Sequence, residues 1–334
     1  MKISGARCLK KALARLNSRG VILMYHRVVE LNYDPWLLSV SPVRFEEHMK
    51  VLKKYGRTVQ MREMGEKLKR FSIGRKEIVI TFDDGYADNF HNAKPILERH
   101  EIKATFFVAS GIFTGREELW WDELERIIFY VKTLPQSFEM FISGTKYHWP
   151  LSLTGDSRVV KETPPNGIMV SRAQLYYALW QILSKLSQQE KKETLHQVAQ
   201  WAGQSSVSRP DNLYMTSEEL VFLSRSPLFE IGAHTVSHPL LSRIPQEKQK
   251  EEIALCKKHL KNMLGNDITS FSYPHGDYSD ITVKLVKELG FRCACTIEQA
   301  SVKRHTDIYC LPRFKVLDWS GDEFEQYLRN CLQE

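Results

Sequence analysis

The chain has 334 residues, and 47 Lys and Arg against 40 Asp and Glu give it a formal net charge of +7. Hydrophobic residues make up 43 % of the chain and charged residues 26 %, which excludes a disordered chain, a collagen-like repeat and a coiled-coil rod. The length fits two domains, or one α/β barrel with an insertion. The sequence carries no nucleic-acid-binding motif, and its charge is not spread as a nucleic-acid-binding surface requires.

The positive charge is concentrated at the N-terminus. Residues 1–19 contain six Lys and Arg and no Asp or Glu, and apolar residues recur at helical spacing from Ile3 to Leu16. The pattern indicates a basic amphipathic helix that either lies on an anionic membrane surface or packs on the outside of the fold. The segment lacks the continuous apolar region of a secretory signal, and no stretch of the chain reaches the ~18 apolar residues of a membrane span. We therefore expect a cytoplasmic protein, with peripheral membrane contact through residues 1–19 as one alternative.

Short β-rich runs alternate with helical patterns along the rest of the chain. Ser41 and Pro42 begin one helix, the capping box from Thr216 to Glu219 opens another, and Ser279 caps a helix that ends at Gly290. This alternation with short links predicts a parallel sheet, open or closed into a barrel. The predicted strands have nearly continuous apolar runs, as strands buried on both faces do, and they are Val21–Tyr25, Glu77–Phe82, Ala104–Ala109, Phe229–Ala233, Ile268–Tyr273 and Phe291–Thr296.

An insertion from about residue 120 to about residue 215 interrupts the pattern of buried strands within residues 20–334. It contains a predicted hairpin around Ser143 and Gly144, a polar loop at 164–167 and helices across 172–201. Insertions at the carboxyl ends of barrel strands face the active site. Trp120 and Trp121 begin the insertion, and these aromatic side chains are expected either to stack on the rings of a ligand or to fix the insertion by burial.

The six cysteines contain no Cys-x-x-Cys pair and are expected to be reduced thiols. Cys293 and Cys295 lie two residues apart in an apolar run, which places them on one face of a strand.

Two carboxylates follow the second predicted strand, in the sequence Thr-Phe-Asp-Asp-Gly from Thr81 to Gly85. Adjacent carboxylates at a strand end repel each other unless a cation or a shared proton lies between them. Taken alone, Asp83 and Asp84 are also compatible with an ordinary turn before Gly85.

Two histidines, His234 and His238, follow another predicted strand, with Pro239 directly after them. Their spacing of four would place both imidazoles on one side of a helical turn, as helices do when they present two nitrogens to one metal ion. Two surface histidines near a helix start are the alternative. Both clusters, however, come after predicted parallel strands, where α/β barrels have their active sites.

One carboxylate and two histidines would form an open metal site with room for water or substrate. Zinc is the first choice of divalent ion, and iron, cobalt or nickel also suit these ligands. The metal would lower the pKa of bound water to about 7 and polarise a carbonyl group. The second carboxylate could then act as general base. The predicted reaction class is amide or ester hydrolysis.

Together these motifs resemble those of the NodB-homology polysaccharide deacetylases, carbohydrate esterase family four, over roughly residues 20–115 and 215–315. The resemblance implies a distorted (β/α) barrel of seven strands, here with a mostly helical insertion, and removal of acetyl groups from sugars. By position in the motifs, it implies that Asp83 is the base and that Asp84, His234 and His238 bind the metal.

A third motif of that family corresponds to residues 272–276, Ser-Tyr-Pro-His-Gly. The resemblance implies that the backbone N–H of His275 helps to hold the oxyanion, a role that tolerates a changed side chain. The family's Arg, which orients the base, is replaced by Ser272. We expect Arg313 either to take its place or to form an ordinary surface ion pair.

The family's C-terminal Leu-x-His motif is absent, because no histidine follows His305. His26, after the first predicted strand, resembles instead the Tyr-His pair of a branch with rearranged motifs, which implies that it is the general acid. A structural histidine with satisfied hydrogen bonds is the alternative. Asp88 and His91 are expected merely to begin the next helix.

The sequence therefore predicts a metal-dependent hydrolase that removes acetyl groups, N-acetyl first, from a carbohydrate or glycolipid and releases acetate. The alternatives are an amidase of small non-sugar substrates on the same fold and an inactive glycan-binding relative. The excess charge says little about the substrate, since residues 20–334 have 41 Lys and Arg against 40 Asp and Glu.

Overall fold

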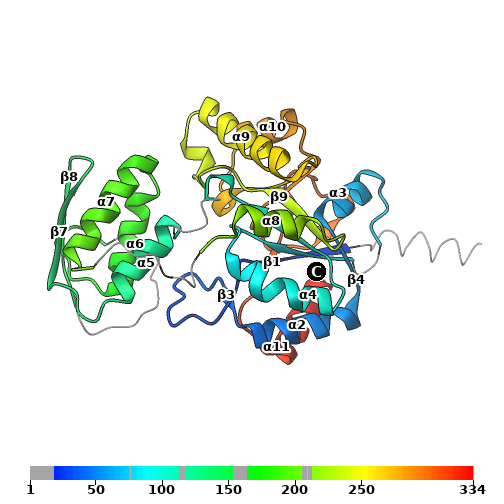
Figure 1. Ribbon diagram of the computed structural model, residues 1–334, viewed down its shortest axis with the longest axis horizontal. Coiled ribbons are helices and arrows are strands. Elements are labelled where there is room, and N and C mark those ends of the chain that lie inside the picture. Colours follow the sequence, from blue (N-terminus) through cyan, green and yellow to red (C-terminus); the bar gives the residue numbers. More distant parts are fainter. Residues whose placement is uncertain are drawn as a thin grey trace, which may run out of the picture. The chain divides into compact units, whose positions relative to one another are not determined.

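The computed structural model describes residues 19–74, 77–112, 118–152, 164–204, 209 and 213–333. These residues form two compact units (Figure 1). The first unit contains residues up to Glu30, residues from Leu38 into the 110s, and residues from Met215 onward. The second contains Leu31–Leu37 and the residues up to Tyr214 that interrupt the first unit. The predicted basic helix of residues 3–16 lies outside the described residues, and Arg19 begins the first strand.

The first unit is a distorted barrel, as the sequence predicted. Within the described residues, seven parallel strands follow one another in space and curl until a parallel bridge from Cys295 to Leu311 and the pairing of the last strand with the first bring the edges together. In spatial order these strands are β1 (Arg19–Tyr25), β5 (Glu77–Phe82), β6 (Ala104–Val108), β9 (Phe229–Ala233), β10 (Ser270–Ser272), β11 (Cys293–Cys295) and β13 (Phe314–Lys315).

Three further pieces of β structure border the barrel. The strand β4 (Arg57–Val59) pairs in parallel with β5, and β12 (Val302–Lys303) pairs antiparallel with β1. Short strands β2 (Arg27–Val28) and β3 (Ser39–Val40) form a separate parallel pair.

Helices cover the outside of the barrel (Figure 1). The C-terminal helix, drawn in red, lies beside the helix Pro42–Tyr55, drawn in blue, although they are far apart in the sequence. In chain order the helices of this unit are α2 (Pro42–Tyr55), α3 (Met61–Lys69), the π-helical turn η1 (Asn89–Ala93), α4 (Lys94–Arg99), η2 (Ser110–Ile112), α8 (Ser217–Ser224), η4 (Leu241–Arg243), α9 (Gln246–Leu264), η5 (Pro274–Gly276), α10 (Asp280–Glu288) and α11 (Gly321–Cys331).

The helix starts read from the sequence are confirmed. Ser41 caps α2, and complete capping boxes at Thr216 and Ser279 open α8 and α10. In each case the side-chain oxygen accepts a backbone N–H that has no partner inside the helix. Gly290, one residue past the cap of α10, has φ 76°, a left-handed conformation that glycine adopts without steric cost.

Alternate residues of the strands belong to two separate hydrophobic clusters. Ile78, Ile80 and Phe82 pack in the cluster under the helices, whereas Val79 belongs to a second cluster with Phe107. Cys293 and Cys295 both join Phe107 and Val79, so these two thiols share one face, as predicted. Strands buried on both faces explain the nearly continuous apolar runs in the sequence. The five described cysteines are free thiols, and four of them are buried.

The second unit is mostly helical, with one hairpin. Its elements are α5 (Trp120–Phe129), β7 (Ser137–Ile142), β8 (Thr145–Pro150), α6 (Arg172–Leu183) and α7 (Gln188–Trp201). The predicted hairpin turn is confirmed at Ser143 and Gly144, whose φ angles are 46° and 79°. Both are positive, as a two-residue hairpin turn of the type I′ class requires. Among the described residues, no helix is long and apolar enough to cross a membrane.

Glu230 is a carboxyl group buried inside the barrel, and its protonation can be tested directly. Burial raises the pKa of this carboxyl, although Ser270 Oγ and the backbone N–H of Arg62 donate hydrogen bonds to it at 2.6 and 2.9 Å. The folded protein therefore binds this proton more tightly than the unfolded chain, and the resulting stabilisation is lost as the pH rises through the raised pKa.

We expect the melting temperature of Glu230→Gln, relative to that of the unsubstituted protein, to increase from pH 4 to pH 7 in thermal denaturation. The same substitution at the exposed Glu288 is the control. A difference between Glu230→Gln and the unsubstituted protein that does not change with pH would contradict the assignment.

Candidate metal and catalytic site

The candidate site lies at the carboxyl ends of the barrel strands. Asp83 and Asp84 directly follow β5, His234 follows β9, and His26 follows β1. Because parallel strands all end at the same rim of a barrel, residues distant in the sequence meet there. The backbone N–H of Asp83 donates to Tyr25 O at 3.1 Å, and that of His234 donates to Val108 O, also at 3.1 Å, so strand pairing continues to the first residue of each motif.

Asp84, His234 and His238 converge on one point. Asp84 Oδ1 lies 3.2 Å from His238 Nε2 and 3.4 Å from His234 Nε2, and the two Nε2 atoms are 3.0 Å apart. All three side chains are buried. Within the described part of the chain, this is the one group of three such side chains whose donor atoms all lie within 4.8 Å of one another.

The chemistry of these donors fits a divalent cation. His234 Nδ1 lies 2.8 Å from Ser272 O, and a carbonyl oxygen can only accept, so Nδ1 carries the proton and Nε2 presents a lone pair. Burial would raise the pKa of Asp84, but His238 and His234 offset this and hold it well below its usual value. Burial also lowers the pKa of His238. The site therefore offers one carboxylate and two imidazoles, the ligand set of open catalytic zinc sites.

The predicted helical presentation of the two histidines is wrong. Residues 234–238 form a loop in which Thr235 and His238 have φ angles of 67° and 55°. These left-handed conformations are incompatible with an α-helix, and Pro239 disfavours a helical conformation at His238. The loop nevertheless brings the two imidazoles together, with ring centroids 4.7 Å apart.

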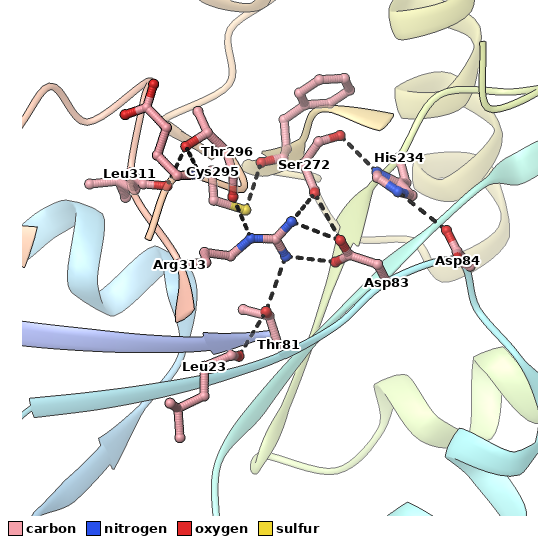
Figure 2. A network of polar contacts seen from close by, with 12 residues as sticks. Leu23, Thr81, Asp83, Asp84, His234, Ser272, Cys295, Thr296, Leu311 and Arg313 are labelled. Carbon is pink, nitrogen blue, oxygen red and sulfur yellow. Dashed lines mark hydrogen bonds and ion pairs between the residues drawn. The ribbon is translucent and has the colours of Figure 1, made fainter. Parts of the chain in front are cut away.

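Arg313 forms a bidentate ion pair with Asp83 inside the barrel. Its two terminal nitrogens donate to Asp83 Oδ1 and Oδ2 at 2.8 and 2.7 Å. Its Nε donates to Thr296 O at 2.8 Å, and further bonds reach Thr81 Oγ1 and Ser272 Oγ at 3.1 and 3.0 Å. Figure 2 shows the guanidinium held between these groups, with Asp84 and His234 beside Asp83. The sequence left a surface ion pair open for Arg313, and its side chain is instead fully buried.

This pair keeps Asp83 ionised. Burial would raise the pKa of Asp83, and the charge and hydrogen bonds of Arg313 outweigh this effect, so its pKa is lower than usual. Burial alone would lower the pKa of Arg313, but the carboxylate of Asp83 raises it above its usual value. At neutral pH Asp83 is therefore a carboxylate with fixed orientation that is able to accept a proton.

The ring of His275 meets that of His238 edge-on, at 4.3 Å between centroids. Both His275 and Gly276 have left-handed backbones, with φ angles of 57° and 67°. A Cβ at Gly276 would come within 2.2 Å of Ile297 Cγ1, so this position requires glycine. The motif thus places the imidazole of His275 against that of His238.

His26 stands in a backbone segment that the turn η1 fixes. Asn89 Nδ2 donates to His26 O at 2.8 Å, Asp88 Oδ1 accepts the N–H of Val28 at 2.8 Å, and Asn92 Nδ2 donates to Val28 O at 2.8 Å. Asp88 precedes the turn η1, as expected, but it does more than begin that turn, because its carboxylate is buried and forms an ion pair with Arg27 at 3.0 Å.

The imidazole of His26 is neutral at pH 7, since burial lowers its pKa to about 4 against the opposing charges of Asp84 and Asp83. These interactions place it in the electrostatic field of both carboxylates.

Trp120 and Trp121 are both buried, and their rings meet edge-on at 5.4 Å. Their burial therefore favours the interpretation that these residues fix the insertion over the interpretation that they stack on a ligand.

The comparisons with known proteins agree with this fold and show the family. The family model described as polysaccharide deacetylase matches residues 72–128 and 176–294. That is more than half of the chain. The chain belongs to the polysaccharide deacetylase family. The family expected from the sequence motifs is thus confirmed, and the match extends further into the insertion than the motifs indicated.

The chain is also similar to individual proteins, one by sequence and two by structure. The chain is 25 % identical over 312 residues to YxkH, a candidate polysaccharide deacetylase of Bacillus subtilis strain 168, covering 92 % of this chain and 76 % of the relative. The deacetylase PplD of Streptococcus pyogenes, solved with acetate, superposes with a TM-score of 0.60 at 16 % identity and covers 95 % of this chain and 99 % of its own. IcaB of Ammonifex degensii superposes with a TM-score of 0.57 at 19 % identity, covering 95 % and 98 %. The last two likenesses show the barrel fold.

Substituting Arg313 tests whether its ion pair with Asp83 stabilises the folded protein. In Arg313→Met, Asp83 would remain as a buried carboxylate without its guanidinium, and we expect the deacetylase to lose about 3–5 kcal/mol of stability at pH 7 in chemical denaturation.

The double variant Asp83→Asn/Arg313→Met should recover part of this loss, because it leaves neither charge buried alone. Arg329→Met removes an exposed Arg that pairs with Glu325, and it should leave stability nearly unchanged. Equal stability of Arg313→Met and Arg329→Met would refute the claim that the fold depends on the ion pair between Arg313 and Asp83.

Proposed function

We propose that the chain is a metal-dependent deacetylase that hydrolyses N-acetyl groups on a carbohydrate and releases acetate. The observation that supports this proposal most directly is the convergence of Asp84, His234 and His238, with the ionised Asp83 held beside them by Arg313. Three ligands and an adjacent base are the components that metal-assisted amide hydrolysis requires. Zinc is our first choice of ion.

A divalent cation held by Asp84, His234 and His238 would polarise the acetyl carbonyl and lower the pKa of the attacking water. Asp83 accepts a proton from that water as oxygen attacks the carbonyl carbon, and Arg313 holds its two oxygens in one orientation. The backbone N–H of His275 is our candidate donor to the developing oxyanion.

The second half of the reaction breaks the carbon–nitrogen bond. The sugar nitrogen gains a proton and leaves as an amine, while the acetyl group leaves as acetate with the oxygen of water. We assign the delivery of that proton to His26. Since the resting imidazole is neutral, the proton has to reach His26 within the reaction cycle, and the water proton that Asp83 removes is the available source.

Separate substitutions distinguish the base from the metal ligands. We expect Asp83→Asn to lower turnover on N-acetylated oligosaccharides by about 10²–10⁴-fold, as loss of a general base does, while its bound metal is retained. His234→Ala should lose both turnover and metal, because a ligand is removed.

Acetate release and elemental analysis of the purified variants measure the two quantities. Full metal content in His234→Ala would contradict the site. Acetate release from small non-sugar amides alone would favour an amidase, and a metal-loaded protein that binds but never hydrolyses acetylated glycans would favour an inactive relative.

The general acid is tested through the leaving group. An amine needs a proton to depart, whereas 4-nitrophenolate does not, so we expect His26→Ala to slow N-acetyl sugar hydrolysis by about 10²–10⁴-fold and 4-nitrophenyl acetate hydrolysis far less.

His91→Ala is the matched control, because His91 is exposed, belongs to the neighbouring turn η1 and pairs with Glu219. An equal loss on both substrates in His26→Ala would assign His26 to another role.

A further inference from the structure

The loop that carries the two metal-site histidines is held in an unfavourable backbone conformation. Thr235 and His238, neither of them glycine, both have left-handed φ angles. Residues adopt such conformations at functional sites when the surrounding structure determines them more strongly than their own preference does. Two backbone bonds contribute here, since the N–H groups of Ser110 and Gly111 donate to the carbonyls of Thr235 and Val236 at 2.9 and 2.8 Å.

Glu252, on helix α9, supplies further bonds at the middle of this loop. Its Oε2 accepts the backbone N–H groups of Val236 and Ser237 at 2.9 and 2.8 Å, and its Oε1 accepts Ser237 Oγ–H at 2.7 Å. One carboxylate thus takes three donors from the two residues between Thr235 and His238.

Helix α9 is itself fixed to the barrel. Ile253, Cys256 and Leu260 are buried in the main core, and Cys256 Sγ lies 3.6 Å from Val108 O at the end of β6. Glu252 therefore connects a rigid element to the loop. Its neighbour Glu251 has a different environment, because it is exposed and pairs with Lys248 at 2.6 Å.

We propose that Glu252 is a positioning residue of the metal site, which sets the conformation of residues 234–238 so that His234 and His238 meet Asp84. The inference rests on the proposed function in that it assumes a cation at these three side chains. Both oxygens of Glu252 are occupied by donors of the loop, so the residue acts through the histidines and not as a ligand. Hydrogen-bond geometry, and not charge, carries this role.

Two near-isosteric changes separate geometry from charge. Glu252→Gln loses the charge, but its amide oxygen can still accept both backbone N–H groups while its amide nitrogen donates to Ser237 Oγ. Glu252→Asp keeps the charge, but its side chain is one methylene shorter, which withdraws the acceptors from the loop. Glu252→Ala removes all three bonds, and Glu251→Gln is the matched control one residue along the same helix.

The measurement is the zinc affinity of each metal-free protein, in competition with a chromophoric chelator. We expect Glu252→Ala and Glu252→Asp to bind zinc about 10–100-fold more weakly, the range for loss of groups that orient metal ligands. Glu252→Gln and Glu251→Gln should bind like the unsubstituted protein. Thermal denaturation of the metal-free proteins shows whether each variant folds, and if Glu252→Ala does not, the Asp and Gln variants carry the test.

The outcomes are distinct. Unchanged zinc affinity in a folded Glu252→Asp or Glu252→Ala variant, with or without a lower melting temperature, would overturn the inference and leave the proposed function standing. Weak binding by Glu252→Gln together with normal binding by Glu252→Asp would assign the effect to charge and would likewise overturn it. An unsubstituted protein that binds no zinc would contradict the metal site itself.

Discussion

The buried ion pair between Arg313 and Asp83 is the interaction on which the site depends. A guanidinium inside a barrel is costly unless its donors are satisfied, and those of Arg313 reach Thr81 and Asp83 at the end of β5, Ser272 at the end of β10 and Thr296 just after β11. These bonds fix the ends of three strands relative to one another. The same rim carries Asp84 and His234, so the charge that orients Asp83 also orders the surroundings of the candidate metal ligands.

Two buried carboxyl groups in the barrel show how local charge decides protonation. Burial opposes ionisation of both Glu230 and Asp83. Glu230 receives hydrogen bonds from Ser270 and a backbone N–H, and its pKa is raised. Both oxygens of Asp83 accept hydrogen bonds from the guanidinium of Arg313, and the pKa of Asp83 is lowered. One barrel thus keeps a protonatable group near the start of its strands and a charged carboxylate at their ends, and full positive charge at hydrogen-bond distance makes the difference.

The sequence predicted the parts of the fold that local pattern determines. Strands β1, β5, β6 and β9 are each at least five residues long and mostly apolar, whereas β13 has two residues and no readable period. The histidine pair was found from its spacing, but its loop geometry was not, because left-handed Thr235 depends on tertiary bonds. Glu252 and Asp88 could not be recognised, since a charged residue on a helix and one before a turn look like ordinary surface positions until the fold brings backbone donors to them.

Leu31–Leu37 belongs to the second compact unit although it begins five residues after His26. Within that unit Trp36 donates to Tyr176 Oη at 2.8 Å and packs against Trp180 at 5.0 Å. The insertion is therefore built from two separate stretches of chain. Exchanging it between related enzymes as one cassette of about a hundred residues would leave the aromatic partners of Trp36 without that residue. A transferable module has to include both stretches, and with them the backbone that leads out of the general-acid candidate.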